Sequence, residues 1–126
     1  MRLLLDTNIV IRLRQSERQI DRATRRAIEG AAAVYVSAAS IWEIAIKAST
    51  RKLAIDLDRL QAALLEAGIK PLPITWTHAW RVYDIAVSHP DPFDRLLLSQ
   101  AVCEPLHLLT TDEQLAQYGG GLVITV

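Results

Sequence analysis

Short apolar runs of three to five residues recur along this chain, and longer segments with helical periodicity separate them. The runs cover residues 3–5, 33–36, 106–109 and 122–126, and a brief extended piece covers residues 71–74. Apolar runs of this length, without polar alternation, are typical of strands buried on both faces. Strands that alternate with helices favour a parallel sheet with helices on both sides. The pattern predicts a single α/β domain across residues 1–126.

The segments between these runs carry apolar residues at three- and four-residue spacing, which is typical of helices with one buried face. A first helical stretch is predicted through residues 9–28, ending at Gly30, and another through residues 57–67, ending at Gly68. The remaining predicted helices cover residues 41–48, 77–86 with Thr77 as the cap, 93–103 and 113–118.

The composition excludes several classes of protein. The chain is 51% hydrophobic, so it can bury a core without disulfides or a structural metal. Cys103 is the only cysteine, which rules out an intrachain disulfide and a thiolate zinc site. No apolar stretch approaches the length of a bilayer span, and the N-terminus reaches Asp6 too early for a signal-peptide core. We therefore expect a soluble, cytoplasmic protein with no membrane association.

The formal charges balance, with 14 Lys and Arg against 14 Asp and Glu. This balance argues against a protein that coats nucleic acid by electrostatics alone. It is compatible with a nuclease, because metal ions can neutralise clustered acids while the basic residues stay outside. The basic residues form two groups, most of them expected on solvated helix faces: Arg12, Arg14, Arg18, Arg22, Arg25 and Arg26, and then Lys47, Arg51 and Lys52.

Four carboxylates on four separate segments are candidates for one site. Ligands bind outside the carboxyl ends of the strands in open α/β sheets, and both Asp6 and Asp112 follow predicted strands. Glu43 and Asp94 lie in the first turns of two predicted helices. Acids packed together repel, and hard divalent cations such as Mg²⁺ or Mn²⁺ relieve that repulsion. Such ions can activate water for phosphodiester hydrolysis. The catalytic and metal-binding candidates are Asp6, Glu43, Asp94 and Asp112.

Each acid also has a structural interpretation, which singly is the commoner one. Asp6, Asp94 and Asp112 could cap the helices or turns that follow them. Glu43 could complete a capping box with Ser40. Only their shared position at one edge of the predicted sheet favours a common site.

Other polar residues point to no competing chemistry. His78, His89 and His107 lie on separate segments without metal-ligand spacing, and each is expected to be structural. The three glycines at residues 119–121 lack the following Lys and Ser or Thr of a phosphate loop. A phosphatase of the haloacid dehalogenase type would need an acid where Asn8 stands. Trp42 could stack on bases, although core packing beside Ile41 is the favoured interpretation.

The order and spacing of four motifs resemble the PIN-domain family, and within it the VapC-type toxins of bacterial toxin–antitoxin modules. The motifs are Leu3-Leu4-Leu5-Asp6-Thr7-Asn8, Ser40-Ile41-Trp42-Glu43-Ile44, His89-Pro90-Asp91-Pro92-Phe93-Asp94-Arg95-Leu96-Leu97 and Leu109-Thr110-Thr111-Asp112. The resemblance runs from end to end, and the D-P-F-D-R-L-L run is its most specific element.

The resemblance implies a Rossmann-like PIN domain with a central parallel sheet of four or five strands flanked by helices. It implies an endoribonuclease that uses Mg²⁺ or Mn²⁺ and water, inhibition by a cognate antitoxin, and homodimerisation. By position, Asp6, Glu43 and Asp94 match the metal-binding acids, and Asp112 matches a fourth acid of more variable role. Asn8 and Thr110 match supporting polar positions, and Arg95 could contact a substrate phosphate or form a structural salt bridge.

Two questions stay open from the sequence. The first is whether the domain cleaves RNA or is a non-catalytic module that binds RNA or a protein. The second is the place of Trp76, Trp80 and Tyr83, which recur on one helical face and could form an exposed patch or part of the core.

Overall fold

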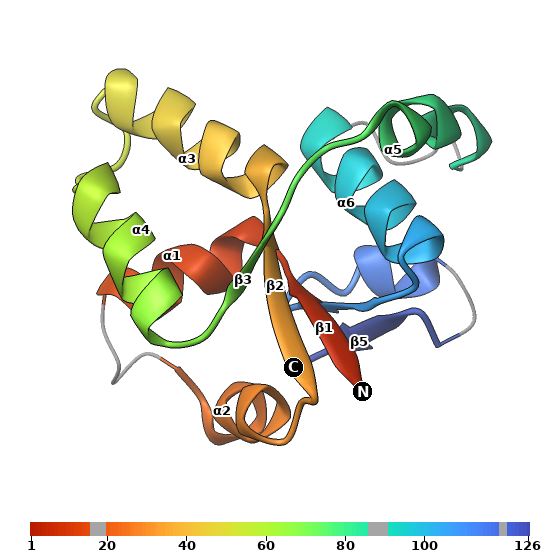
Figure 1. Ribbon diagram of the computed structural model, residues 1–126, viewed down its shortest axis with the longest axis horizontal. Helices are drawn as coiled ribbons and strands as arrows, with labels where there is room; N and C mark the ends of the chain where they lie inside the picture. Colours follow the sequence, from red (N-terminus) through yellow and green to blue (C-terminus); the bar gives the residue numbers. More distant parts are fainter. Residues whose placement is uncertain (16–19, 86–90, 119–120) are drawn as a thin grey trace.

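The protein is built around a parallel sheet. The structure, a computed structural model, describes residues 1–15, 20–85, 91–118 and 121–126. In these ranges the sheet has five parallel strands in the order β3-β2-β1-β4-β5 (Figure 1). The strands are β1 (Arg2–Leu5), β2 (Ala33–Ser37), β3 (Lys70–Leu72), β4 (His107–Thr110) and β5 (Val123–Thr125). The predicted α/β class and its parallel sheet are confirmed.

The strand order marks where a ligand site should lie. β1 pairs with β2 on one side and with β4 on the other. The chain passes from β1 outward to β2 and β3, and then crosses back to β4 on the opposite side of β1, so the strand order reverses there. In open α/β sheets the crevice for ligands lies at such a switch point, outside the carboxyl ends of the strands. The residues that follow β1 and end β4 therefore lie at the place the fold offers for chemistry.

Both faces of the sheet are buried. Leu3 and Leu5 of β1 join a core that α1 (Thr7–Gln15), α3 (Ala38–Ser49) and α4 (Leu57–Glu66) cover. Leu4 points to the other face, into a core with Leu97 and Leu98 of α6 (Pro92–Cys103). Figure 1 shows α1, α3 and α4 on one side of the strands and α6 on the other. This burial explains why β1 is apolar throughout instead of alternating.

The predicted helical stretch through residues 9–28 is wrong as a single helix. α1 ends at Gln15, and a separate helix, α2 (Arg22–Glu29), follows. The Asp21 carboxylate caps α2 by accepting a hydrogen bond from the Thr24 backbone N–H at 2.7 Å. Apolar periodicity can persist across such a break because both helices cover the same core, and residues 16–19 lie outside the described residues.

Other boundaries also shift. Thr75, not Thr77, caps α5 (Trp76–Arg81), and a 3₁₀ turn, η2 (Val82–Asp84), continues it; residue 86 lies outside the described residues. The predicted helix at residues 113–118 is reduced to the 3₁₀ turn η3 (Leu115–Gln117). β3 contains Pro71 and lies at the edge of the sheet, where a missing N–H is tolerated. In the described ranges no helix is both long and apolar enough to cross a membrane.

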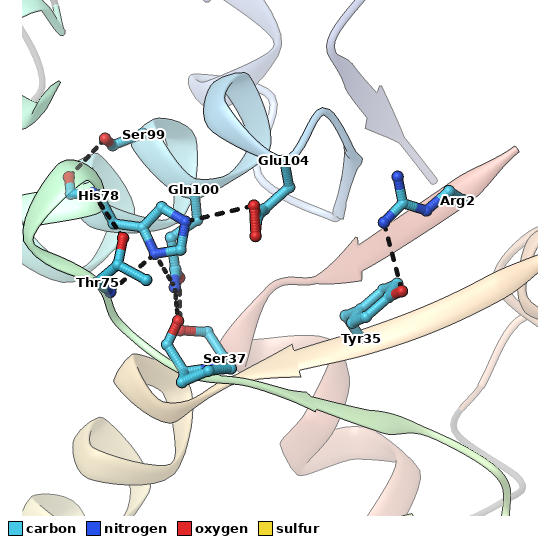
Figure 2. A network of polar contacts seen from close by, with 9 residues as sticks. Arg2, Tyr35, Ser37, Thr75, His78, Ser99, Gln100 and Glu104 are labelled. Atoms are coloured by element: carbon cyan, nitrogen blue, oxygen red, sulfur yellow. Dashed lines mark hydrogen bonds and ion pairs between the residues drawn. The ribbon is translucent and has the colours of Figure 1, made fainter.

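A buried polar network joins α5 and α6 to β2 (Figure 2). Gln100 Oε1 accepts a hydrogen bond from Ser37 Oγ at 2.5 Å, and Gln100 Nε2 lies 3.3 Å from His78 Nδ1. The His78 ring also accepts from the Thr75 backbone N–H at 3.1 Å, and its Nε2 lies 3.6 Å from Glu104 Oε2. His78 is thus a buried, hydrogen-bonded structural residue, as predicted.

Substitution of Gln100 by Leu is expected to destabilise the protein. The change would leave the buried groups of Ser37 and His78 without their partner, at a cost of about 2–3 kcal/mol in the free energy of unfolding. Urea unfolding at neutral pH measures this cost. The exposed Gln61→Leu change is the matched control, and an equal effect of both substitutions would contradict the structural role of the network.

Candidate functional site

Asp6 follows β1 directly and is the most buried of the four candidate acids. Its backbone N–H donates to the Leu109 carbonyl at 2.9 Å, which continues the β1–β4 ladder by one residue. Only 3% of Asp6 is exposed. Asp6 also directly precedes α1, and its carbonyl accepts from the Val10 N–H at 3.2 Å, so the alternative position at the start of the helix is confirmed as well. The fold therefore places this buried carboxylate at the switch point between β1 and β4.

Polar groups from three elements hold Asp6 in place. Thr110, the last residue of β4, donates from Oγ1 to Asp6 Oδ2 at 2.6 Å, and the Thr7 backbone N–H donates to Oδ1 at 2.8 Å. Thr7 Oγ1 in turn donates to Ser40 Oγ of α3 at 2.9 Å. Thr110 thus has the supporting position expected for it. The parts played by Thr7 and Ser40 were not predicted, although Thr7 lies within the Asp-Thr-Asn motif.

Glu43 lies in the second turn of α3 and not at its cap. Ser37 caps this helix by accepting from the Ala39 N–H at 3.0 Å, so the alternative capping box of Ser40 with Glu43 is wrong. The Glu43 side chain is largely buried, and its Oε2 lies 3.0 Å from Lys47 Nζ. Because Glu43 does not cap α3, its carboxylate is a candidate ligand at the site.

Asp94 lies in the first turn of α6, and its neighbour Asp91 provides the cap. Asp91 Oδ1 accepts from the backbone N–H groups of Phe93 at 2.8 Å and Asp94 at 3.3 Å. Pro92 occupies the first helical turn, where the absence of its N–H costs nothing. The alternative that Asp94 is merely the cap of α6 is therefore wrong.

Asp112 combines two interactions beyond β4. Its backbone N–H donates to Thr110 Oγ1 at 3.0 Å, and its Oδ1 accepts from the Gln114 N–H at 2.9 Å. The turn-capping interpretation is thus confirmed for this residue. The same Thr110 hydroxyl that holds Asp6 also orients the backbone of Asp112, so the two acids share one support.

The four acids, which we call the acid cluster, perturb one another electrostatically. Burial is the largest cause that raises the pKa of Asp94 to about 7, and the negative charges of Asp6, Asp91, Glu43 and Asp112 contribute the rest in that order. Burial also raises the pKa of Asp6, against the lowering effect of its bonds from Thr110 and Thr7, and Glu43 and Asp112 add to the rise. The charges of Glu43 and Asp112 thus act on both Asp6 and Asp94, and that of Asp6 acts on Asp94, so these acids lie within electrostatic range of one another.

The donor set of the acid cluster fits a hard divalent cation. Within the described ranges, no three Asp, Glu, His or Cys side chains are placed to hold a metal ion as they stand. The chemistry nevertheless suits Mg²⁺ or Mn²⁺, which prefer carboxylate oxygens and tolerate water in the remaining positions. A cation would also offset the desolvation and repulsion that raise the pKa of Asp94.

Two other predicted site residues contribute less to the cluster. Asn8 is exposed on the first turn of α1, and no described hydrogen bond joins it to an acid. Arg95 Nη2 donates to the Val82 carbonyl at 3.4 Å, which joins α6 to η2, while its buried Nε has no hydrogen-bond partner among the described residues. Of the other histidines, His107 is half-buried on β4 and His89 lies outside the described residues.

Comparison with known proteins gives a family and a fold. The sequence model of the PIN domain matches residues 3–121. No curated protein matches the sequence.

Three solved structures have similar folds. A toxin–antitoxin complex from Klebsiella pneumoniae contains a chain with 22% identity and a TM-score of 0.70, covering 98% of this chain and 96% of that one. VapBC2 from Rickettsia felis, bound to a DNA fragment from its promoter, gives 13% identity and a TM-score of 0.71 over 99% and 98% of the two chains. FitAB bound to the IR36 DNA fragment gives 19% identity and a TM-score of 0.65 over 98% and 94%.

Proposed function

This chain belongs to the PIN domain family, and from that membership and the acid cluster we propose that it is a metal-dependent endoribonuclease, the toxin of a toxin–antitoxin pair. PIN domains are generally nucleases. The observation that carries the proposal is the buried Asp6 carboxylate at the carboxyl end of β1, held by Thr110 and Thr7 and exposed to the charges of Glu43 and Asp112, because acids placed in this way repel one another unless a cation joins them. A protein that only binds a partner by its surface has no need of this arrangement.

Asp6, Glu43 and Asp94 are the proposed ligands of Mg²⁺ or Mn²⁺, and Asp112 completes the set or orients water. When bound, such an ion lowers the pKa of a water molecule and neutralises charge on the phosphodiester. Thr110 and Thr7 fix the Asp6 carboxylate by hydrogen bonds to its two oxygens. Because these donors are already in place, Asp6 needs little reorganisation when it binds.

The proposed nucleophile is water. No Ser–His or Cys–His pair lies at the acid cluster in the part of the chain that the structure describes, and His78 is committed to the network beside α5. In-line attack by water on phosphorus breaks the bond to the 3′ oxygen and leaves a 5′-phosphate and a 3′-hydroxyl. The proposed place of action is the cytoplasm, as expected from the sequence.

Incubation of purified protein with a mixed pool of single-stranded RNA tests the proposal. Cleavage is expected with Mg²⁺ or Mn²⁺ and not with EDTA, and restored metal should restore it. If well-folded protein free of any antitoxin leaves every RNA in the pool intact with either metal, the proposal fails. Binding without cleavage would then favour the non-catalytic module.

Thr110→Val is expected to reduce cleavage about 10- to 100-fold without unfolding the protein. Valine keeps the shape of the side chain but removes the hydroxyl that donates to Asp6 and accepts from Asp112. Cleavage rates across a range of Mg²⁺ concentrations measure the effect, and part of the loss should be recovered at high Mg²⁺. Thr125→Val on β5 is the control. Unchanged cleavage by Thr110→Val would rule out a supporting role.

A cognate antitoxin is the second proposed partner. The folds of a Klebsiella toxin–antitoxin complex and of VapBC2 are similar to this chain over nearly its whole length. A polypeptide segment lying over the acid cluster would inhibit the protein by excluding RNA from Asp6 and Asp94. Co-expression of a cognate antitoxin should then restore growth to cells that the toxin alone arrests.

The proposed homodimer would form through α5 and η2. Trp76, Trp80 and Tyr83 are 95%, 81% and 89% exposed, and we call them the aromatic face. The six such side chains of two copies would bury roughly 1,000 Å² or more, which approaches a standard interface. Arg81 and Asp84 lie beside the aromatic face, 3.6 Å apart, and a two-fold axis would let each pair with its opposite in the second copy.

Replacement of both Trp76 and Trp80 by Ser is expected to convert a dimer to a monomer. The change removes most of the apolar area of the aromatic face without touching the core, because both side chains lie on the surface. Sedimentation equilibrium gives the mass of the variant and of the unmodified protein. Leu65→Ser, which alters an exposed apolar residue on α4, is the control. The same dimer mass in the double variant would exclude this surface.

A further inference from the structure

Two further aromatic side chains, separate from the aromatic face on α5 and η2, lie beside the acid cluster. Trp42 of α3 and Phe93 of α6 pack edge to face, with ring centroids 5.2 Å apart and planes at 66°. Each immediately precedes an acid of the cluster, Glu43 or Asp94. Trp42 is 59% exposed, so the prediction that it packs in the core is wrong. The contact with Phe93 restrains an exposed indole next to the proposed site of cleavage.

A groove of about 600 Å³ lies between α3 and the start of α6. Glu43, Lys47 and Lys52 line one side, and Asp91, Pro92 and Phe93 line the other. Glu43 belongs both to the acid cluster and to this groove, and Phe93 belongs both to the groove and to the aromatic pair. Through these two residues the groove adjoins the acid cluster and the aromatic pair.

The end of α3 gathers positive charge at this groove. The Lys52 backbone N–H donates to the Lys47 carbonyl at 3.0 Å, which turns the chain back and brings the two lysines close together. This turn requires Arg51 to adopt a left-handed conformation, with φ of 59°. Glycine is favoured at such a position, and a long basic side chain there carries a conformational cost. Two cations thus line the groove: Lys47, which is paired with Glu43 at 3.0 Å, and Lys52.

We propose that this groove binds the single-stranded RNA that flanks the scissile phosphate, with Trp42 and Phe93 stacking on a nucleobase and Lys52 contacting a backbone phosphate. The inference rests on the proposed nuclease function. Grooves that combine aromatic rings with cations are suited to unpaired nucleic acid, because rings stack on any base and cations follow the phosphates. Lys52, the groove cation that Glu43 does not pair with, favours RNA over an apolar protein segment as the occupant. Stacking on a ring that is already restrained costs little conformational entropy.

Binding of fluorescein-labelled 12-nucleotide RNA tests the proposal. Asp94→Asn serves as the background, so that cleavage does not interfere. Adding Trp42→Ala should raise the Kd for single-stranded RNA by about 5- to 100-fold, and Trp42→Phe should recover most of the affinity. The Kd for a duplex of the same sequence should not change, because its bases are already stacked. Leu65→Ala, at an exposed apolar residue of α4, should have no effect.

The salt dependence of Kd distinguishes the contribution of Lys52 from that of Trp42. The Lys52→Ala variant should bind more weakly at low salt, with a slope of log Kd against log salt concentration that is smaller by about one. The loss caused by Trp42→Ala should be nearly the same at low and high salt, because stacking involves no counterion. In protein that retains Asp94, Trp42→Ala should raise KM with little change in kcat, as expected for a residue that binds the substrate.

The outcomes distinguish this inference from the nuclease proposal. Unchanged Kd and KM in Trp42→Ala, in protein that cleaves RNA, would overturn the groove and leave the nuclease intact. A change in oligomeric mass caused by Trp42→Ala would also overturn it, in favour of a protein interface. If the unmodified protein does not cleave RNA but its binding still depends on Trp42, the groove stands and the nuclease proposal fails.

Discussion

Asp94→Asn is expected to lower the rate of RNA cleavage by about three orders of magnitude. Asparagine preserves the shape of the side chain but removes the negative charge that a divalent cation would neutralise. A loss of several kcal/mol in stabilisation of the transition state corresponds to this change in rate. Asp94 lies in the first turn of a helix that Asp91 caps independently, so the fold should survive the substitution. Single-turnover cleavage of a defined single-stranded RNA with excess Mg²⁺ measures the effect.

Glu66→Gln is the matched control, because it removes one negative charge from an exposed position on α4 outside the acid cluster. Its cleavage rate should be within about twofold of the unmodified rate, as is usual for surface changes away from a site. Cleavage by Asp94→Asn at a similar rate would show that this carboxylate does not hold the metal. Asp6 and Glu43 would then need another explanation for their burial and repulsion.

The location of the acids could be predicted because it follows from the backbone. Asp6 ends an apolar run, and any residue that directly follows a central parallel strand lies at the carboxyl edge of the sheet. The capping alternatives for Glu43 and Asp94 could not be decided from sequence, since Ser37 and Asp91 compete with Ser40 and Asp94 for the same role. Only the position at which each helix starts settles which residue is the cap.

Side-chain exposure could be predicted less well. Trp42 neighbours Ile41 and Ile44, so composition favours burial, yet the helix turns the buried Ile44 toward the sheet and leaves Trp42 and Ile46 exposed. If the buried face of a helix is predicted one residue out of place, a side chain expected in the core lies on the surface instead. Trp76, Trp80 and Tyr83 were correctly identified as sharing a face, but their exposure depends on what packs against α5, and α6 covers only its opposite side.

The metal-free protein is expected to lose stability as pH rises from about 4 through 7. The pKa of Asp94 is about 7 in the folded protein against an ordinary value of 3.8, so between these values the folded state binds more protons than the unfolded state. The free energy of unfolding therefore falls with pH over this range and levels off above it. Without a cation, the acid cluster is therefore expected to lower the free energy of unfolding at neutral pH.

Asp94→Asn should remove most of this pH dependence and stabilise the metal-free protein. A pKa moved from 3.8 to about 7 corresponds to about 4 kcal/mol at full ionisation, and because the side chain is partly exposed to solvent we expect a gain of about 2 kcal/mol at pH 8 and little at pH 4. Urea unfolding in EDTA at pH 4, 6 and 8 measures both proteins. Mg²⁺ should stabilise the unmodified protein at pH 8 more than the variant, because only the former has the full set of ligands.

If Asp94→Asn were less stable than the unmodified protein at pH 8, the repulsion inferred for the acid cluster would be absent. Loss of cleavage in a variant that is more stable at pH 8 would instead show that the charge of Asp94 serves function at the expense of stability.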